Sequence, residues 1–381
     1  MSVGTVDRRV RRALAFTPME TRREVLVRAA VLADELGYEA VVVPEGWGLD
    51  AAVVLAEIAV RTSRIRLVAG VFSVWGRSPA TLAMTAATLD DLSGGRFTLG
   101  LGASTAALAE RFHGVPFAGP AGRLRSTAEQ VRALLRGERA GIPGARKGIA
   151  LGQSARPGLP LWIAGLGPRA TAVATEHGDG WFPTFLPRDR VGEIRARVRA
   201  SAAGDPELIC GPAVALDSPD LPGRWAAEQL IGWYLTGMGP FYAGFAAANG
   251  YADEVAALRA ANPKPAPGRL VWPRAADPLL PQVAVFGDTA AVHTGLAEWD
   301  DLVDIVTVCV GPGPAETVLA QVTAGAPVPA MVRRAPHRAD HAPGGASPPS
   351  NTSPEAGAAP VPDGAVAHSI PASSRPSSGR R

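Results

Sequence analysis

A short glycine-rich segment is the clearest candidate ligand site in this sequence. Gly165-Leu166-Gly167-Pro168-Arg169 follows an apolar run typical of a strand and precedes residues with helical spacing. Glycines let a ligand approach the backbone closely, and Pro168 suits the first turn of a helix. Free N–H groups and the helix dipole favour an anion there, and Arg169 would add positive charge. We therefore expect this segment to bind an anion, although an ordinary strand-to-helix turn has a similar composition.

Glu45 is the acidic residue best placed for chemistry, because it stands just past the apolar run 40–43. A carboxylate there can accept a hydrogen bond from a ligand, or act as a general acid if burial raises its pKa. The competing interpretation is an ordinary solvated loop carboxylate. In the same loop, Trp47 either lines a pocket or packs against the protein.

Other reactive side chains have simpler structural interpretations. His113 fits a role in fixing its loop, and His177 ends an expected helix, where a cation suits the dipole. Cys210 and Cys309 lie in apolar runs without metal or redox spacing, so we expect inert core residues. The sequence shows no Ser–His–Asp order, zinc spacing or Walker loop. Such a chain fits a redox enzyme whose cofactor carries the chemistry, and we expect no metal site.

Residues 65–102 indicate the kind of element that must position these groups. Apolar residues alternate over 65–71 and recur through 97–101, which predicts two buried strands. Between them, apolar residues at helical spacing over 82–89 predict a helix, and Ser93-Gly94-Gly95 predicts a tight turn. The unit is therefore strand–helix–strand, as in parallel β/α proteins.

The same alternation runs through most of the chain. We expect strands at 13–16, 40–43, 65–71, 97–101, 161–164, 179–181, 208–216 and 303–310, with 283–286 also extended. Expected helices lie at 26–36, 54–59, 82–89, 122–135, 168–177, 289–298 and 315–322, and an insertion at about 222–275 holds two apolar helices. Eight strands suggest an α/β fold of the (β/α)8 TIM-barrel type, although a doubly wound open sheet has the same pattern.

In a TIM barrel, catalytic and binding residues lie at the carboxyl ends of the strands. That rule selects Thr17 and the segments 45–47, 70–74, 102–105, 165–167 and 181–184. Gly102 and Ser104 enter the candidate set in this way, beside Glu45 and the glycine-rich segment.

Composition limits the remaining classes of function. The 381 residues are 47% hydrophobic and 19% charged, enough for a sizeable core, and the net charge of +3 comes from scattered arginines. We therefore expect neither a nucleic-acid partner nor a membrane span, and a reduced, cytoplasmic protein. Residues 1–10 form a polar lead, 11–330 the barrel, and 335–381 a disordered tail rich in Pro, Ser, Gly and Ala.

Two stretches carry a family resemblance. GRSPATLAMTAATLDDLSGGRFTLGLG, at 76–102, and ERFHGVPF, at 110–117, resemble the luciferase-like oxidoreductases, more narrowly the actinobacterial members that use the deazaflavin coenzyme F-420. The resemblance covers roughly residues 11–325. It implies a TIM barrel, a homodimer, and hydride transfer between the coenzyme and a small organic substrate.

The resemblance also implies roles for particular residues. It places a cis peptide bond at Gly70–Val71, behind the central ring of the coenzyme, and assigns the coenzyme's phosphate to the segment 165–169. Arg77, Arg123 and Arg125 are further candidates for the coenzyme's acidic tail, or else ordinary surface arginines. Several family members carry a histidine for proton transfer after the acidic residue, but here Gly46 follows Glu45.

Two rival functions stay open. A monooxygenase of the same fold would use FMN and oxygen, and sequence separates it poorly from a deazaflavin enzyme. Alternatively, the barrel has lost catalysis and serves as a binding protein, which the missing histidine would allow. The apolar, Trp-rich region 225–245 hints at an organic rather than a sugar-phosphate substrate, or else forms core or a dimer interface.

Overall fold

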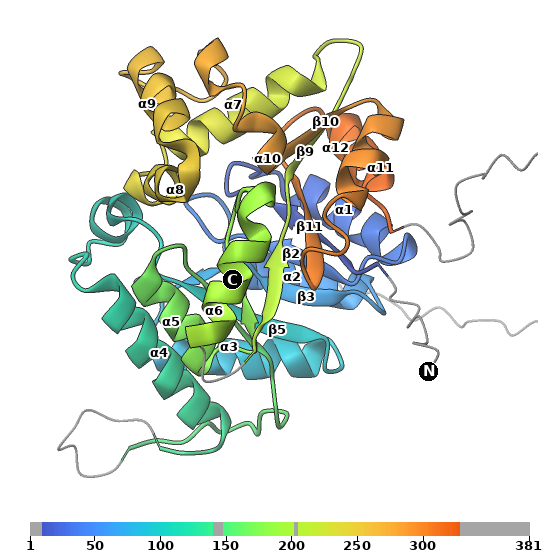
Figure 1. Ribbon diagram of the computed structural model, residues 1–381. Coiled ribbons are helices and arrows are strands. Elements are labelled where there is room, and N and C mark those ends of the chain that lie inside the picture. The colour runs from blue at the N-terminus through green and yellow to red at the C-terminus, as the bar shows by residue number, and fades with distance from the viewer. Residues whose placement is uncertain (1–9, 140–147, 202–204, 328–381) are drawn as a thin grey trace, which may run out of the picture. The chain divides into compact units, whose positions relative to one another are not determined.

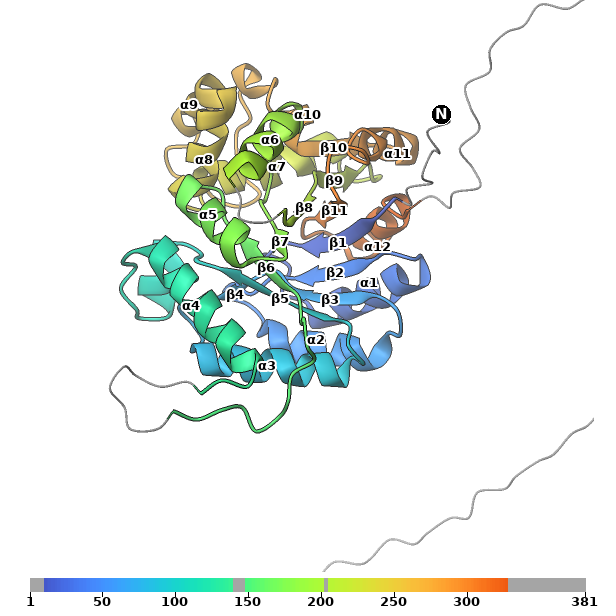
Figure 2. The ribbon, with the colours of Figure 1, turned by 60° about the horizontal axis from the view of Figure 1, so that its bottom comes forward.

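Parallel strands close into a barrel in the computed structural model, which describes residues 10–139, 148–201 and 205–327 (Figures 1 and 2). The barrel strands are β1 (Arg12–Phe16), β2 (Ala40–Val43), β3 (Arg66–Ala69), β5 (Phe97–Gly102), β6 (Leu161–Ala164), β7 (Gly180–Trp181), β8 (Glu207–Cys210) and β11 (Ile305–Val310). Because β1 pairs with both β2 and β11, the sheet is closed, which excludes the open doubly wound alternative. The TIM-barrel prediction is confirmed.

Side chains alternate between the outside and the inside of the barrel along the strands. In β1, Leu14 packs outward with the surrounding helices, whereas Ala13 and Ala15 belong to the inner cluster. In β2, Val41 and Val43 pack outward and Val42 inward. All residues of both strands are buried, which explains why their sequences are apolar at every position apart from Arg12.

Helices surround the barrel and follow most strands in turn. They are α1 (Arg23–Glu35), α2 (Ala51–Arg61), α3 (Pro79–Leu92), α4 (Pro120–Leu135), α5 (Pro168–His177), α6 (Val191–Ser201), α11 (Thr289–Ala297) and α12 (Ala315–Ala324). Side-chain caps start several of them: Asp50 accepts from the Ala52 N–H at 2.9 Å, and Asp288 from the Ala291 N–H at 2.8 Å. The helix α6 was not expected from the sequence, although Val191, Ile194 and Val198 form its buried stripe.

The seventh strand is broken, so the continuous strand expected at 208–216 is wrong in that detail. β8 ends at Cys210 and β9 (Ala213–Leu216) begins after Gly211-Pro212. Pro212 has no N–H for the ladder, and a Cβ at Gly211 would lie 2.1 Å from the Thr307 carbonyl oxygen. Beyond the break, β9 pairs with β11 on one side and with β10 (Ala284–Gly287) on the other.

The segment between β9 and β10 is helical, and Figure 1 shows it in yellow and orange over one end of the molecule. It contains α7 (Gly223–Thr236), α8 (Pro240–Ala246), α9 (Ala252–Ala261) and the short α10 (Leu280–Val283). Three of these helices lie within 222–275, where two were expected. Gly239 separates α7 from α8, and Gly250 separates α8 from α9. These glycines have φ of +87° and +101°.

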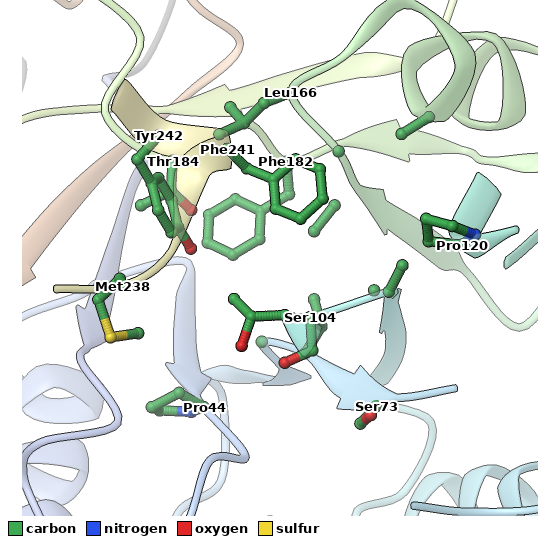
Figure 3. Close-up of a pocket in the computed structure, with 18 of the residues that line it drawn as sticks. Pro44, Ser73, Ser104, Pro120, Leu166, Phe182, Thr184, Met238, Phe241 and Tyr242 are labelled. Carbon is green, nitrogen blue, oxygen red and sulfur yellow. The ribbon is translucent and has the colours of Figure 1, made fainter. Parts of the chain in front are cut away.

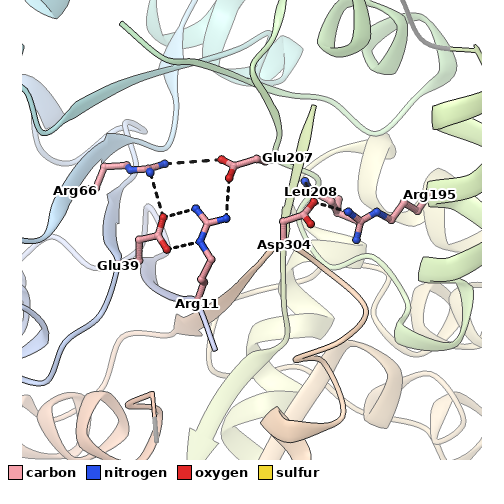
Figure 4. A network of polar contacts seen from close by, with 7 residues as sticks. All are labelled: Arg11, Glu39, Arg66, Arg195, Glu207, Leu208 and Asp304. Carbon is pink, nitrogen blue, oxygen red and sulfur yellow. Dashed lines mark hydrogen bonds and ion pairs between the residues drawn. The ribbon is translucent and has the colours of Figure 1, made fainter. Parts of the chain in front are cut away.

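At the opposite end of the barrel, an ion-pair network links the starts of several strands (Figure 4). Arg11, just before β1, binds Glu39, just before β2, and donates to Glu207 of β8 at 2.8 Å. Arg66 of β3 lies 3.1 Å from Glu39. Beside this network, Arg195 of α6 pairs with Asp304 at 2.6 Å, and Asp304 also accepts from the Leu208 N–H. These contacts tie strands together far from the carboxyl ends.

Several expectations fall outside the described residues. The polar lead at 1–10 is described only at residue 10, and the tail at 335–381 lies wholly outside. Over the part of the chain that the structure describes, no helix has the length and apolar character needed to cross a membrane.

Candidate active site

A cavity of about 660 Å³ opens at the carboxyl ends of the barrel strands (Figure 3). Nine of the residues that the sequence nominated for catalysis or coenzyme binding line it: Glu45, Gly70, Val71, Gly102, Ser104, Gly165, Leu166, Gly167 and Arg169. These residues come from the loops after four different strands. The topology therefore brings separate sequence motifs to one site, which is large enough for a coenzyme-sized ligand.

The end of β3 forms the floor of the cavity. The Gly70–Val71 peptide bond is cis, as the resemblance implied. A Cβ at Gly70 would lie 1.9 Å from Val42 Cγ1, and one at Gly102 would lie 2.5 Å from Val71 Cγ2. Glycine is therefore needed at both positions, because Val42 of β2 and Val71 occupy the space that a Cβ would need.

Two non-glycine residues with left-handed backbone line the same cavity. Ser104, just after β5, has φ of +53°, and Phe185, after β7, has φ of +56°. Positive φ is unfavourable for residues with a Cβ and is found preferentially at functional sites. Among the described residues, these are the two that adopt it outside glycine.

The start of α5 forms a second part of the wall. Gly167 is the N-cap and has no side chain to cap the first turn, and a Cβ at that position would meet no atom within 4 Å. Trp181 donates from Nε1 to the Gly165 carbonyl at 2.8 Å and so fixes the loop. Arg169 is exposed and forms no ion pair with the described residues. The segment thus leaves backbone groups and one cation open to a ligand.

Glu45 lies in the wall as half of an ion pair. Arg77 donates from Nη2 to Glu45 Oε1 at 2.6 Å and to Asp50 Oδ1 at 2.7 Å, and its guanidinium stacks on Phe72. The hydrogen bond to Glu45 raises the pKa of Arg77 above its ordinary value. In this pair the Glu45 side chain serves as a hydrogen-bond acceptor for Arg77.

The other arginine candidates are also occupied. Arg123 donates to the Val74 carbonyl at 3.2 Å and lies over the Trp75 ring, and Arg125 pairs with Glu176 on α5. Arg77, Arg123 and Arg125 are absent from the residues that line the cavity. They hold loops and helices in place at the rim.

Trp47 and the two histidines do not line the cavity. Trp47 is 41% exposed at the surface. The ring of His113 packs on Gly76, where a Cβ would lie 2.7 Å from its Cε1, as expected for a loop-fixing residue. His177 ends α5, and its Nε2 lies 3.4 Å from Oε1 of Glu129 on α4.

Most of the apolar residues that line the cavity were not predicted from the sequence. Phe185 follows β7, and α7 and α8 with their connection contribute Tyr234, Met238, Phe241 and Tyr242. The available signal was the aromatic composition of region 225–245, which did not show where those helices fold. Cys309 is buried in the core, as expected, and also reaches the lining. Burial raises its pKa to about 12, so it stays a neutral thiol, as expected for an inert residue.

The fold and the cavity define a TIM-barrel protein with a coenzyme-sized site at the carboxyl ends of its strands. Residues 10–304 match the family described as luciferase-like monooxygenases. The chain therefore belongs to the luciferase-like family, and the resemblance seen in the sequence is confirmed.

Individual relatives agree with this assignment. A Mycobacterium tuberculosis protein, described as a candidate coenzyme F-420-dependent oxidoreductase, is 30% identical over 299 residues, which cover 70% of this chain and 85% of the relative. The solved coenzyme F-420-dependent tetrahydromethanopterin reductase of Methanopyrus kandleri superposes with a TM-score of 0.66 at 19% identity, covering 84% of this chain and 98% of that one. A monooxygenase of Streptomyces bottropensis superposes with a TM-score of 0.59 at 20% identity, covering 83% and 97%.

Proposed function

We propose that this protein is an oxidoreductase that transfers a hydride between coenzyme F-420 and a small organic substrate. The observation that carries the proposal is the convergence of Gly70–Val71, Gly102–Ser104 and Gly165–Arg169 on one cavity. The relative described as F-420-dependent, matched over most of its length, supports the same coenzyme.

The residues present fit such a group. Gly70, Val71 and Gly102 line the cavity where the ring of the coenzyme would lie, and the two glycines present backbone rather than side chains there. The uncapped start of α5, with Arg169, would hold a phosphate. When bound, the deazaflavin supplies the atom that accepts or donates the hydride.

The protein's own part is to bind, orient and exclude water. Backbone groups at 165–167 and the Ser104 turn would fix the coenzyme, and Glu45, held by Arg77, would accept a hydrogen bond at the cavity wall. Phe117, after β5, and Phe241 of α8 contact each other across the cavity lining, with ring centroids 6.2 Å apart. Their contact limits access of water from that side.

Turnover without oxygen tests this proposal. The purified protein is mixed anaerobically with reduced F-420 and a panel of ketones, and with oxidised F-420 and the matching alcohols, while the coenzyme absorbance is followed. Turnover under anaerobic conditions supports hydride transfer. Turnover that needs reduced FMN and oxygen would instead support the monooxygenase alternative, and lack of both would favour a barrel that only binds ligands.

The proposal also includes a homodimer, which is expected from the family resemblance, and a cytoplasmic location, which is expected from the composition. Sedimentation of the purified chain would test the dimer directly.

A further inference from the structure

One side of the cavity is built from aromatic and apolar side chains outside the proposed coenzyme-binding segments. We call it the aromatic wall; it consists of Phe185, Tyr234, Met238, Phe241 and Tyr242. The Phe185 and Tyr234 ring centroids are 4.7 Å apart and those of Tyr234 and Tyr242 4.9 Å apart, both edge to face. In Figure 3, Met238 and Tyr242 lie on one side of the cavity, while Pro120 and Ser73 lie on the other. The wall is therefore a packed surface that is already formed.

The aromatic wall carries no formal charge. Among the described residues that line the cavity, the charged side chains are Glu45 and Arg169. Glu45 is neutralised by Arg77, and Arg169 belongs to the start of α5, which is assigned to the coenzyme. A charged group placed against the wall would lose its hydration without gaining an ionic partner, which strongly disfavours its binding.

Tyr242 adds one polar group to this apolar surface. Its side chain extends from α8 into the cavity in Figure 3, and it is partly accessible, whereas Tyr234 beside it is only 4% exposed. Burial raises the pKa of Tyr242 to about 12, so the hydroxyl group stays protonated and available as a donor. Glu45 accepts hydrogen bonds from Arg77, so of these two side chains it is Tyr242 that can donate one to a ligand.

We propose that the aromatic wall selects an uncharged, mainly apolar organic substrate, and that Tyr242 donates a hydrogen bond to its carbonyl or hydroxyl oxygen. This inference rests on the proposed function, because it assigns the part of the cavity that the coenzyme-binding segments leave. Sugar phosphates and carboxylates are accordingly poor substrates. Tyr242 acts as a specificity residue that orients the oxygen-bearing carbon.

A matched pair of probes tests the charge preference on the full chain. F-420 is first titrated by fluorescence, and acetophenone and 4-acetylbenzoate, which differ by one carboxylate, are then titrated onto the loaded protein by ligand-observed NMR. We expect acetophenone to bind at least about tenfold more tightly. Equal or tighter binding of 4-acetylbenzoate would overturn the inference while F-420 binding still stands. Failure of F-420 to bind would overturn the proposed function itself.

Variants locate the preference on the wall. Tyr242→Phe should weaken acetophenone binding about tenfold and leave ethylbenzene, which lacks the oxygen, unchanged. Tyr251→Phe is the control, because Tyr251 is a buried tyrosine of the same helical region that does not line the cavity. Unchanged acetophenone binding by Tyr242→Phe would contradict the role of the hydroxyl group.

A charge introduced into the wall provides a second check. Met238→Lys should shift the preference towards 4-acetylbenzoate by about tenfold or more, since the new ammonium group would pair with the carboxylate. F-420 affinity, measured in parallel, reports whether the variant is folded. An unchanged preference in a variant that still binds F-420 would show that substrate does not contact this wall.

Discussion

At the scale of single residues, the Glu45–Arg77 pair couples the cavity wall to the loop after β3. Arg77→Met would leave Glu45, whose side chain is 11% exposed, and Asp50 without their cation. We expect the free energy of unfolding to fall by about 2–3 kcal/mol, because a largely buried charge loses its partner. F-420 affinity should fall as well, since Glu45 lines the site.

Urea denaturation measures this loss. The control is Arg61→Met, which removes an exposed arginine paired with Glu57 one helical turn away, and should cost less than about 0.5 kcal/mol. If both variants lost the same small free energy of unfolding, the Glu45–Arg77 pair would stabilise the fold no more than an exposed ion pair does.

At Gly100, β5 lies very close to the backbone of β3. A Cβ at Gly100 of β5 would lie 1.9 Å from the Ala69 carbonyl oxygen, an atom that cannot move without disturbing β3. Gly100→Ala should therefore cost more than about 3 kcal/mol or prevent folding. Gly192→Ala, in the first turn of α6 with no atom within 4 Å of its Cβ, should instead stabilise by about 0.5–1 kcal/mol. Thermal unfolding of the two variants compares them directly, and similar melting temperatures would contradict the close-approach argument.

Residue types predicted part of the site. The segment 165–169 could be recognised because glycines, proline and arginine at the start of a helix point to anion binding from local sequence alone. The Glu45–Arg77 pair could not, because its partners are 32 positions apart and meet only after β2 and β3 have paired.

At the scale of elements, one carboxylate sets the start of β3. Asp34, near the end of α1, accepts from the backbone N–H groups of Ser63, Arg64 and Ile65, at 3.0, 3.0 and 2.6 Å. Burial alone would raise the pKa of Asp34, but these hydrogen bonds outweigh it and lower the pKa below its ordinary value. The folded state thus favours the ionised form and keeps the loop before β3 in place.

The pH dependence of stability tests that role. A lowered pKa stabilises the fold above the unfolded-state pKa of about 3.9, and the stabilisation is lost as pH falls through the folded-state value. Asp34→Asn should therefore destabilise by about 1–3 kcal/mol at neutral pH, and its difference from the wild type should shrink below about pH 4. A difference that is constant with pH would exclude ionic hydrogen bonding as the cause.

Most element positions followed from hydrophobic periodicity. The strands at 40–43 and 161–164 were predicted to the residue because apolar runs of strand length are bounded by loop residues. The break between β8 and β9 was missed because apolar residues lie on both sides of Gly211-Pro212, and the close approach of Gly211 to Thr307 appears only in the fold. α6 was missed because its apolar stripe is narrow within an arginine-rich run.

At the scale of the whole molecule, the two ends of the barrel serve different purposes. The cavity occupies the carboxyl end, and the Arg11–Glu39–Arg66–Glu207 network occupies the other. Arg11→Met would leave two carboxylates near each other with only Arg66 between them. We expect a loss of about 1–2 kcal/mol in unfolding free energy and F-420 affinity unchanged within about twofold. Calorimetry with a parallel F-420 titration measures both, and a large loss of affinity would show that the ends are coupled.

Closure of the barrel could not be predicted from the sequence pattern alone. Strand–helix alternation is shared by open sheets and barrels, and the family resemblance decided between them. Pairing of β1 with β11 joins residues almost 300 positions apart, as in Ala13 with Thr307, so no local pattern could reveal it. The aromatic wall was hidden for the same reason, because α7 and α8 reach the cavity only through the fold.

The proposed function requires the cavity to bind a deazaflavin in preference to a flavin. This preference is measured by titrating the purified chain with oxidised F-420 and, separately, with FMN, followed by fluorescence. We expect micromolar binding of F-420 and far weaker binding of FMN, and Gly167→Glu should weaken F-420 binding by placing a negative side chain at the start of α5. Tighter binding of FMN than of F-420 would refute the proposed coenzyme.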